Sequence, residues 1–175
     1  MKRPLLTVAL LGMCLFVFTG FQVTGQPETV NAKLSGFLSN NPISTAAKSN
    51  FTAQISSDNS MITYTLTYSN IEGVSASASH IHFGQWWANG GVIAYLCGGG
   101  GKPDCPSTSG TVTGTIVASD IIGPAEQGIE AGELAEALTA IRSGVTYVNI
   151  HSTTFPGGEI RGQIRPRLGL LFGRF

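Results

Sequence analysis

The chain has 175 residues, ten basic and ten acidic side chains, and a formal net charge of zero. This length fits one domain with a sizeable core. The balanced charge argues against nucleic-acid binding, which depends on neutralising phosphates with Lys and Arg. Only 11% of the residues are charged and 23 are glycine, against about 25% charged residues in an average soluble domain. This composition is typical of an extracellular, β-rich protein rather than of a cytosolic helical enzyme.

The first residues predict a targeting segment rather than a part of the fold. A positive start at Lys2 and Arg3 precedes an apolar run, 5–18, that is too short to span a bilayer comfortably. Small and polar residues then lead to a cleavage site before Gln26. We therefore expect residues 1–25 to be a signal peptide, which leaves a secreted or periplasmic protein with no stable membrane span after cleavage. The alternative is an uncleaved membrane anchor.

Period-two alternation of apolar and polar residues predicts most of the strands that follow. Asp58 and its neighbours form a turn-rich stretch between two alternating runs, which predicts a β-hairpin. Short strands separated by turn residues are typical of an antiparallel β-sandwich or barrel. The expected strands, in chain order, cover residues 33–38, 51–56, 62–68, 91–96, 111–116, 147–151 and 159–164.

Without residues 1–25, the chain keeps two cysteines, Cys97 and Cys105, on either side of a glycine-rich loop. An even number of cysteines in an exported protein predicts a disulfide. A thiolate pair that binds metal is the alternative, although its spacing is wider than that of the usual zinc motifs.

One segment predicts a helix, near 124–143, that packs against the edge or end of the sheets. Pro124 suits a first helical turn, and Gly144 suits a left-handed C-terminal residue. The apolar residues of this segment recur at helical spacing, as the positions of Leu134, Leu138 and Ile141 show. Beyond the expected strands, residues 166–175 form a basic and apolar tail that can extend the last strand, fray or dock.

All three histidines of the chain fall in two short motifs. Alternate residues of a strand share a face, so His80 and His82 lie on the face opposite Ile81, and Asn149 lies on one face with His151. If these two strands are neighbours, the three imidazoles can bind one ion. Imidazole ligands suit copper or zinc.

The last expected strand adds candidates for the surroundings of that ion. Glu159 and Arg161 share one face of this strand, where they can also form an ion pair. We expect Asn149, Glu159 and Arg161 to form hydrogen bonds with the histidines, in a polar network that fixes the strand register. The alternative is that the histidines bind a metal ion and that these residues support its ligands.

Trp86 and Trp87 stand together in a polar, glycine-containing segment. Paired aromatic residues in a loop can bind a saccharide ring or an apolar patch of an extracellular partner protein. The alternative is that one of them packs inward as an anchor of the loop.

Three motifs together resemble the CHRD domain, which is named after the extracellular protein chordin. The resemblance covers roughly residues 30–165, and we expect one domain over 26–165. It departs from the usual family pattern at Asn40-Asn41-Pro42, Phe83-Gly84-Gln85 and Ser152. The motifs are His80-Ile81-His82, Tyr147-Val148-Asn149-Ile150-His151 and Phe155-Pro156-Gly157-Gly158-Glu159-Ile160-Arg161-Gly162-Gln163.

The resemblance implies an exported all-β fold that is immunoglobulin-like or superoxide-dismutase-like, and it implies little about activity. The chain has no nucleophile motif, phosphate-binding loop or dense carboxylate cluster. We therefore expect a non-enzymatic binding or structural module outside the cell. The alternative is a copper- or zinc-binding protein, in which a dismutase-like activity would need a redox metal with an open coordination position. Asn50 begins a glycosylation sequon, which matters only in a eukaryotic secretory pathway.

Overall fold

The computed structural model describes residues 26–166, so the predicted signal peptide and nearly all of the C-terminal tail lie outside the described residues. Nine strands and one α-helix make up the described part, with short 3-10 turns at Gly36–Leu38, Ala118–Asp120 and Ala125–Gln127. The elements are β1 (Glu28–Ser35), β2 (Lys48–Ile55), β3 (Ile62–Ser69), β4 (Ala76–Phe83), β5 (Val92–Cys97), β6 (Gly110–Ile116), α1 (Leu134–Arg142), β7 (Thr146–Ser152), β8 (Ile160–Gln163) and β9 (Arg165–Pro166).

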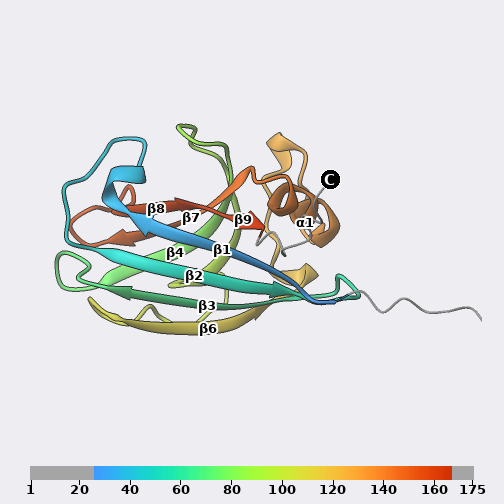
Figure 1. Cartoon of the computed structure of the whole chain (residues 1–175), viewed down its shortest axis with the longest axis horizontal. Coiled ribbons are helices and arrows are strands. Elements are labelled where there is room, and N and C mark those ends of the chain that lie inside the picture. The colour runs from blue at the N-terminus through green and yellow to red at the C-terminus, as the bar shows by residue number, and fades with distance from the viewer. Residues whose placement is uncertain (1–25, 167–175) are drawn as a thin grey trace, which may run out of the picture.

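The strands form one antiparallel sheet that curls into a nearly closed barrel (Figure 1). Their order is β5-β4-β7-β8-β1-β2-β3-β6, and β9 pairs with β1 beside β8. The curl brings the two edge strands, β5 and β6, into contact. Beside them, the hydroxyl of Tyr64 on β3 donates a 2.7 Å hydrogen bond to the carbonyl of Leu96 on β5. The predicted all-β architecture is therefore confirmed.

The alternating strands β2 and β3 show how the sequence builds the core. Phe51 on β2 and Leu66 on β3 are opposite each other in the register and point inward, while their threonine neighbours point to solvent. The predicted hairpin turn joins the two strands, and the carboxylate of Asp58 accepts hydrogen bonds from the hydroxyls of Ser56 and Ser60. These hydrogen bonds lower the pKa of Asp58 to about 2.

The first strand begins earlier than the predicted 33–38 and ends at Ser35. The chain turns at Gly36, whose carbonyl accepts a hydrogen bond from the N–H of Ile43. A Cβ atom at Gly36 would lie 2.2 Å from the carbonyl oxygen of Ile43, so only glycine permits this close return. The turn places the segment after β1 beside β8, near the functional site described below.

The predicted helix is present, but it begins at Leu134 rather than near 124. Both Gly128 and Gly132 have φ of 90°, a left-handed conformation that an α-helix cannot contain. The buried residues of α1 include Leu138 and Ile141, and the helix covers one end of the barrel (Figure 1). No helix in residues 26–166 is long and apolar enough to cross a membrane.

Candidate functional site

The two histidine motifs lie on neighbouring strands. β4 and β7 pair antiparallel, with His80 opposite Asn149 and His82 opposite Tyr147. Ile81, Val148 and Ile150 point from the same strands into the core, where each is at most 1% exposed. The histidines therefore lie on the outer face of the sheet, and the strand pairing alone brings them together.

The three imidazoles are close enough to act on one ligand. The ring centroids of His80 and His82 are 5.4 Å apart, and those of His80 and His151 are 5.0 Å apart. One nitrogen from each ring lies within 4.8 Å of the other two. His80 and His82 are each only 8% exposed, while His151 is half-buried. The rings thus form a compact cluster, which we call the histidine cluster.

Two of these rings are oriented by backbone carbonyls. The Nδ1–H of His82 donates to the carbonyl of Gly90 at 2.9 Å, and the Nδ1–H of His151 donates to the carbonyl of Pro156 at 2.8 Å. A neutral imidazole has one N–H. Both Nε2 atoms therefore carry lone pairs, and both face the side-chain amide of Asn149. This tautomer is the one in which Nε2 can bind a metal ion.

The amide of Asn149 cannot satisfy both lone pairs. Its Nδ2 donates to Nε2 of His151 at 2.7 Å, while its Oδ1 lies 3.2 Å from Nε2 of His82. The second contact places one acceptor against another when His82 is neutral. Rotating the amide by 180° exchanges the two contacts and moves the same conflict to His151. Only a proton or another cation between these atoms removes the conflict.

Burial disfavours a proton on His80 or on His82. Desolvation is the main cause that lowers the pKa of His80 to about 4, and the neighbouring charges of His151 and His82 add to it. Burial is also the main cause that lowers the pKa of His82. In addition, Nδ1 of His80 is buried and has no hydrogen-bond partner among the described residues. At neutral pH, His80 and His82 are therefore uncharged and can bind a metal through a free lone pair.

Asn149 and Arg161 lie opposite each other on β7 and β8, beside the histidines, but the contacts of Arg161 differ from those expected. Its guanidinium carbon lies 3.4 Å from the centre of the Tyr147 ring, whose other neighbour is the ring of His82, stacked at 4.7 Å. Arg161 also donates hydrogen bonds to Oδ1 of Asn40 at 3.0 Å and to the carbonyl of Gln85 at 2.8 Å. The ring of Tyr147 therefore lies between Arg161 and the ring of His82.

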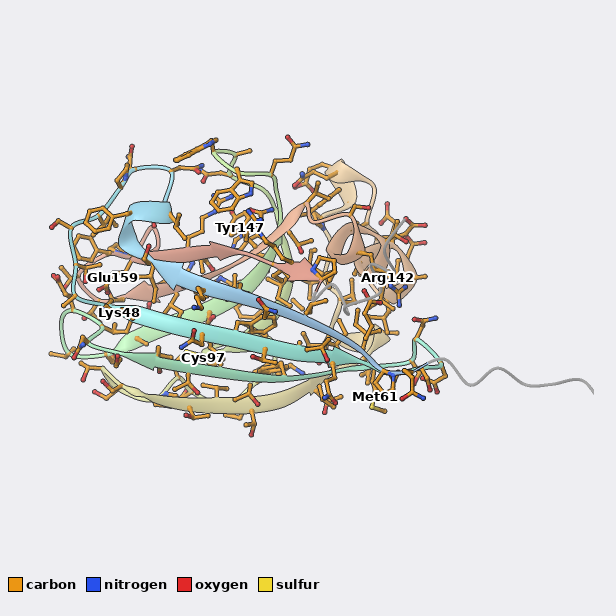
Figure 2. The ribbon with its side chains drawn as sticks, viewed as in Figure 1. Lys48, Met61, Cys97, Arg142, Tyr147 and Glu159 are labelled. Atoms are coloured by element: carbon orange, nitrogen blue, oxygen red, sulfur yellow. A yellow bond between two sulfur atoms is a disulfide. The ribbon has the colours of Figure 1, made fainter. Side chains whose placement is uncertain are left out.

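Glu159 contacts a different part of the protein from the one predicted. Its carboxylate accepts hydrogen bonds from the hydroxyl of Thr45 at 2.7 Å and from the N–H of Glu72 at 3.2 and 3.1 Å. Figure 2 shows Glu159 near one end of the sheet and Tyr147 beside the loops above it. No ion pair forms between Glu159 and Arg161 in residues 26–166. The carboxylate therefore joins two loops and does not support the histidines.

A cleft of about 550 Å³ opens beside the histidine cluster. Its walls include His82, His151, Tyr147 and Arg161, so one side of it is formed by the outer face of β4, β7 and β8. The loops after β1 and after β7 and the segment 84–91 form the remaining walls. We call this hollow the histidine cleft and the segment 84–91 the tryptophan loop.

The tryptophan loop holds both tryptophans at the surface. Trp87 is 70% exposed and Trp86 is 39% exposed, with their ring centroids 6.4 Å apart. Trp87 has φ of 65°, a conformation that non-glycine residues rarely adopt. Neither side chain is a buried anchor, so the loop is held instead by the contacts of Gln85 and Gly90 with Arg161, His82 and Tyr147.

Sequence reasoning missed three contributors to the site. Tyr147 lies between His82 and Arg161, Tyr95 packs edge-on against His80 at 4.4 Å, and Asn40 contacts Arg161 from the loop after β1. Tyr147 precedes Asn149 by two residues, which predicts that both side chains lie on the same face of the strand. Tyr95 and Asn40 come from segments whose placement depends on the fold.

The predicted disulfide between Cys97 and Cys105 is present and closes the glycine-rich loop. The features described so far define a class: a small, disulfide-bonded antiparallel β-barrel with a histidine-rich outer face. Comparison with known families agrees, since the family model of the CHRD domain matches residues 30–164. The chain therefore belongs to the CHRD domain family, as its motifs indicate, and the family supports a small binding module of the extracellular type. No curated protein sequence matches the chain.

Proposed function

We propose that this protein is an exported, non-enzymatic binding module and that its histidine cluster binds a copper or zinc ion. The observation that carries the metal proposal is the unsatisfied geometry around Asn149. The lone pair of His82 Nε2 faces an amide oxygen 3.2 Å away, and a cation placed between two such acceptors turns a repulsive contact into two attractive ones.

The chemistry of the donors favours copper or zinc over harder ions. Imidazole nitrogens are borderline-soft ligands, whereas calcium and magnesium prefer carboxylate and carbonyl oxygens. The carboxylate of Glu159 is occupied by Thr45 and Glu72, so it offers nothing to a hard ion at the cluster. The amide oxygen of Asn149 is the nearest additional ligand.

Carbonyl groups already orient two of the ligands. The Nδ1–H groups of His82 and His151 donate to backbone carbonyls, the arrangement that commonly accompanies metal-bound histidine. Closing the cluster on one ion requires only small movements, because its ligand nitrogens already lie within 4.8 Å of one another. In this step Nε2 of His151 exchanges its hydrogen bond from Asn149 for the ion.

Export rests on independent features. The positive and apolar segment at 1–25 has the pattern of a signal peptide. A structural disulfide is typical of oxidising compartments, which include the cell exterior and the periplasm. These features support secretion or periplasmic localisation of a protein that meets metal outside the cytosol.

Metal titration monitored by thermal unfolding tests the proposal. The untagged protein is treated with EDTA, dialysed, and titrated with copper or zinc. Because all three histidines of the chain are in the cluster, no other imidazole can respond. An ion at 100 times its dissociation constant stabilises the fold by about 2.7 kcal/mol.

The variants separate a specific site from surface binding. We expect His82→Ala to abolish the stabilisation, and the exposed-site control Glu126→Gln to keep it. If the wild-type protein shows no stabilisation, or if His82→Ala shows the same stabilisation, the cluster is a polar network that fixes the strands and binds no ion.

A further inference from the structure

Within residues 26–166, Arg161 is a buried cation without a carboxylate partner. Its side chain is 6% exposed, and it faces the histidine cleft. All ten acidic side chains of the chain lie within residues 26–166, and none of them forms an ion pair with Arg161 there. Buried charges in proteins are normally paired, because an uncompensated charge costs several kcal/mol.

The protein groups around Arg161 compensate this charge only in part. Its partners are the Oδ1 atom of Asn40, the carbonyl of Gln85 and the ring of Tyr147, all of them neutral. A guanidinium has five N–H donors, and two hydrogen bonds from this group are formed in the described structure. Burial lowers the pKa of Arg161, as expected for a cation without a counter-ion.

The described walls of the cleft in front of Arg161 carry no opposing charge. No aspartate or glutamate is among these lining residues, and Arg161 is the fixed charge that they include. A guanidinium binds carboxylate, sulfate and phosphate groups through parallel hydrogen bonds. The electrostatics therefore favour an anionic ligand, and the volume of about 550 Å³ is in the range of small-molecule sites, roughly 300–1,000 Å³.

The remaining walls are rich in amides. Four asparagine side chains line the cleft, each of which can donate and accept hydrogen bonds, and two of them, Asn40 and Asn89, bond each other across its rim at 2.6 Å. Such groups match a ligand with many hydroxyls rather than an apolar one. The four residues are Asn40, Asn41, Asn89 and Asn149.

The tryptophan loop adds exposed aromatic surface next to these amides. Asn89 and Gly90 of this loop line the cleft, while Trp87 is 70% exposed. The left-handed backbone conformation of Trp87 is unfavourable for a bulky residue, and such conformations are common at ligand-binding sites. The flat apolar face of a sugar ring can stack on an exposed indole while its hydroxyls bind amides.

We infer that the histidine cleft and the tryptophan loop bind an acidic saccharide, with Arg161 receiving the carboxylate of a uronic acid unit, the asparagines receiving hydroxyls and Trp87 packing on a sugar ring. This inference goes beyond the proposed metal site and does not rest on it. The test therefore uses protein that has been stripped of metal with EDTA and then dialysed free of EDTA, so that a failure to bind metal has no influence on the result.

Tryptophan fluorescence provides the measurement, because Trp86 and Trp87 are the only tryptophans of the chain. The protein expressed from the full sequence is titrated with the trimer of galacturonic acid. The matched neutral probe is the same trimer with its carboxylates methyl-esterified, and sodium sulfate serves as a simple anion. We expect the acid to bind at least tenfold more tightly than the ester, and sulfate at the same concentration not to displace it.

Variants assign the preference to the named residues. Arg161→Gln should bind the acid and the ester equally, whereas Lys48→Gln, which removes an exposed positive charge from β2, should keep the preference. Trp87→Ala should weaken the acid and the ester by the same factor. If Arg161→Gln fails to fold, Arg161→Lys, which keeps the charge and loses the planar fork, should reduce the preference.

Several outcomes overturn the inference. If the wild-type protein binds the acid and the ester equally, Arg161 does not bind the carboxylate. If it binds neither trimer, the cleft is not a saccharide site. Full displacement by sulfate shows a simple anion site without saccharide recognition. A preference for the acid that survives in Arg161→Gln shows that Arg161 only holds the tryptophan loop in place.

Discussion

Replacing Glu159 separates the stability of the barrel from the function of its histidine cluster. The carboxylate is fully buried and accepts hydrogen bonds from the hydroxyl of Thr45 and the N–H of Glu72. Each hydrogen bond to a charged group contributes about 1.5–3 kcal/mol. Removing the carboxylate also spares the cost of burying it, so we expect Glu159→Ala to lower the free energy of unfolding by about 3 kcal/mol.

Glu159→Gln keeps the size of the side chain and one acceptor oxygen, so its expected loss is smaller, about 1 kcal/mol. Urea denaturation followed by circular dichroism measures both losses, with the exposed-site variant Glu126→Gln expected within about 0.5 kcal/mol of the wild type. Because the carboxylate faces Thr45 and Glu72, we expect Glu159→Gln to bind copper or zinc as tightly as the wild type. A tenfold loss of metal affinity in Glu159→Gln, or an unchanged stability of Glu159→Ala, would refute this reasoning.

Three further predictions concern the disulfide, the response to acid and export. Replacing Cys97 and Cys105 by Ser opens a short loop, with a sequence separation of 8, and should lower the free energy of unfolding by about 2.5 kcal/mol by the loop-entropy relation; equal melting temperatures of the oxidised and reduced proteins would contradict this. The pKa of His80 is 6.5 in the unfolded chain and about 4 in the folded chain, where the ring is buried. The neutral ring therefore contributes fully to the free energy of unfolding above about pH 6.5, and this contribution is lost as the pH falls. The free energy of unfolding of the metal-free protein should therefore fall by about 2 kcal/mol by pH 5 because of His80. Denaturation at each pH measures this loss, and an equal loss in His80→Leu would show that another group is responsible. Mass spectrometry of the native protein should find a chain that begins near Gln26, and an intact N-terminus in a membrane fraction would exclude cleavage.

Local sequence patterns predict much of this fold because the alternation in its strands is unusually regular. β2 and β3 follow the predicted runs within three residues, since each buried apolar residue is flanked by polar ones. The start of α1 is less predictable. The acidic and apolar residues before Leu134 fit a helix. However, Gly128 and Gly132 adopt left-handed conformations that prevent a helix there, and these conformations depend on the surrounding structure.

The candidate site is likewise only partly predictable from the sequence. The shared faces of His80 with His82 and of Asn149 with His151 follow from the period of a strand, and their meeting requires only that β4 and β7 pair. The orientation of Glu159 does not follow from that period, because two distant loops supply its hydrogen-bond donors. The contacts of Arg161 with Asn40 and Gln85 likewise depend on loops whose paths are set by the complete fold.

Anomalous diffraction shows directly whether the histidine cluster binds metal. Crystals of the EDTA-treated protein are soaked in zinc, and anomalous diffraction is recorded on both sides of the zinc absorption edge. We expect one strong peak among the imidazoles of His80, His82 and His151, with zinc–nitrogen distances of about 2.0–2.1 Å. An anomalous map with no peak among these rings, or with zinc only at surface carboxylates, would contradict this expectation.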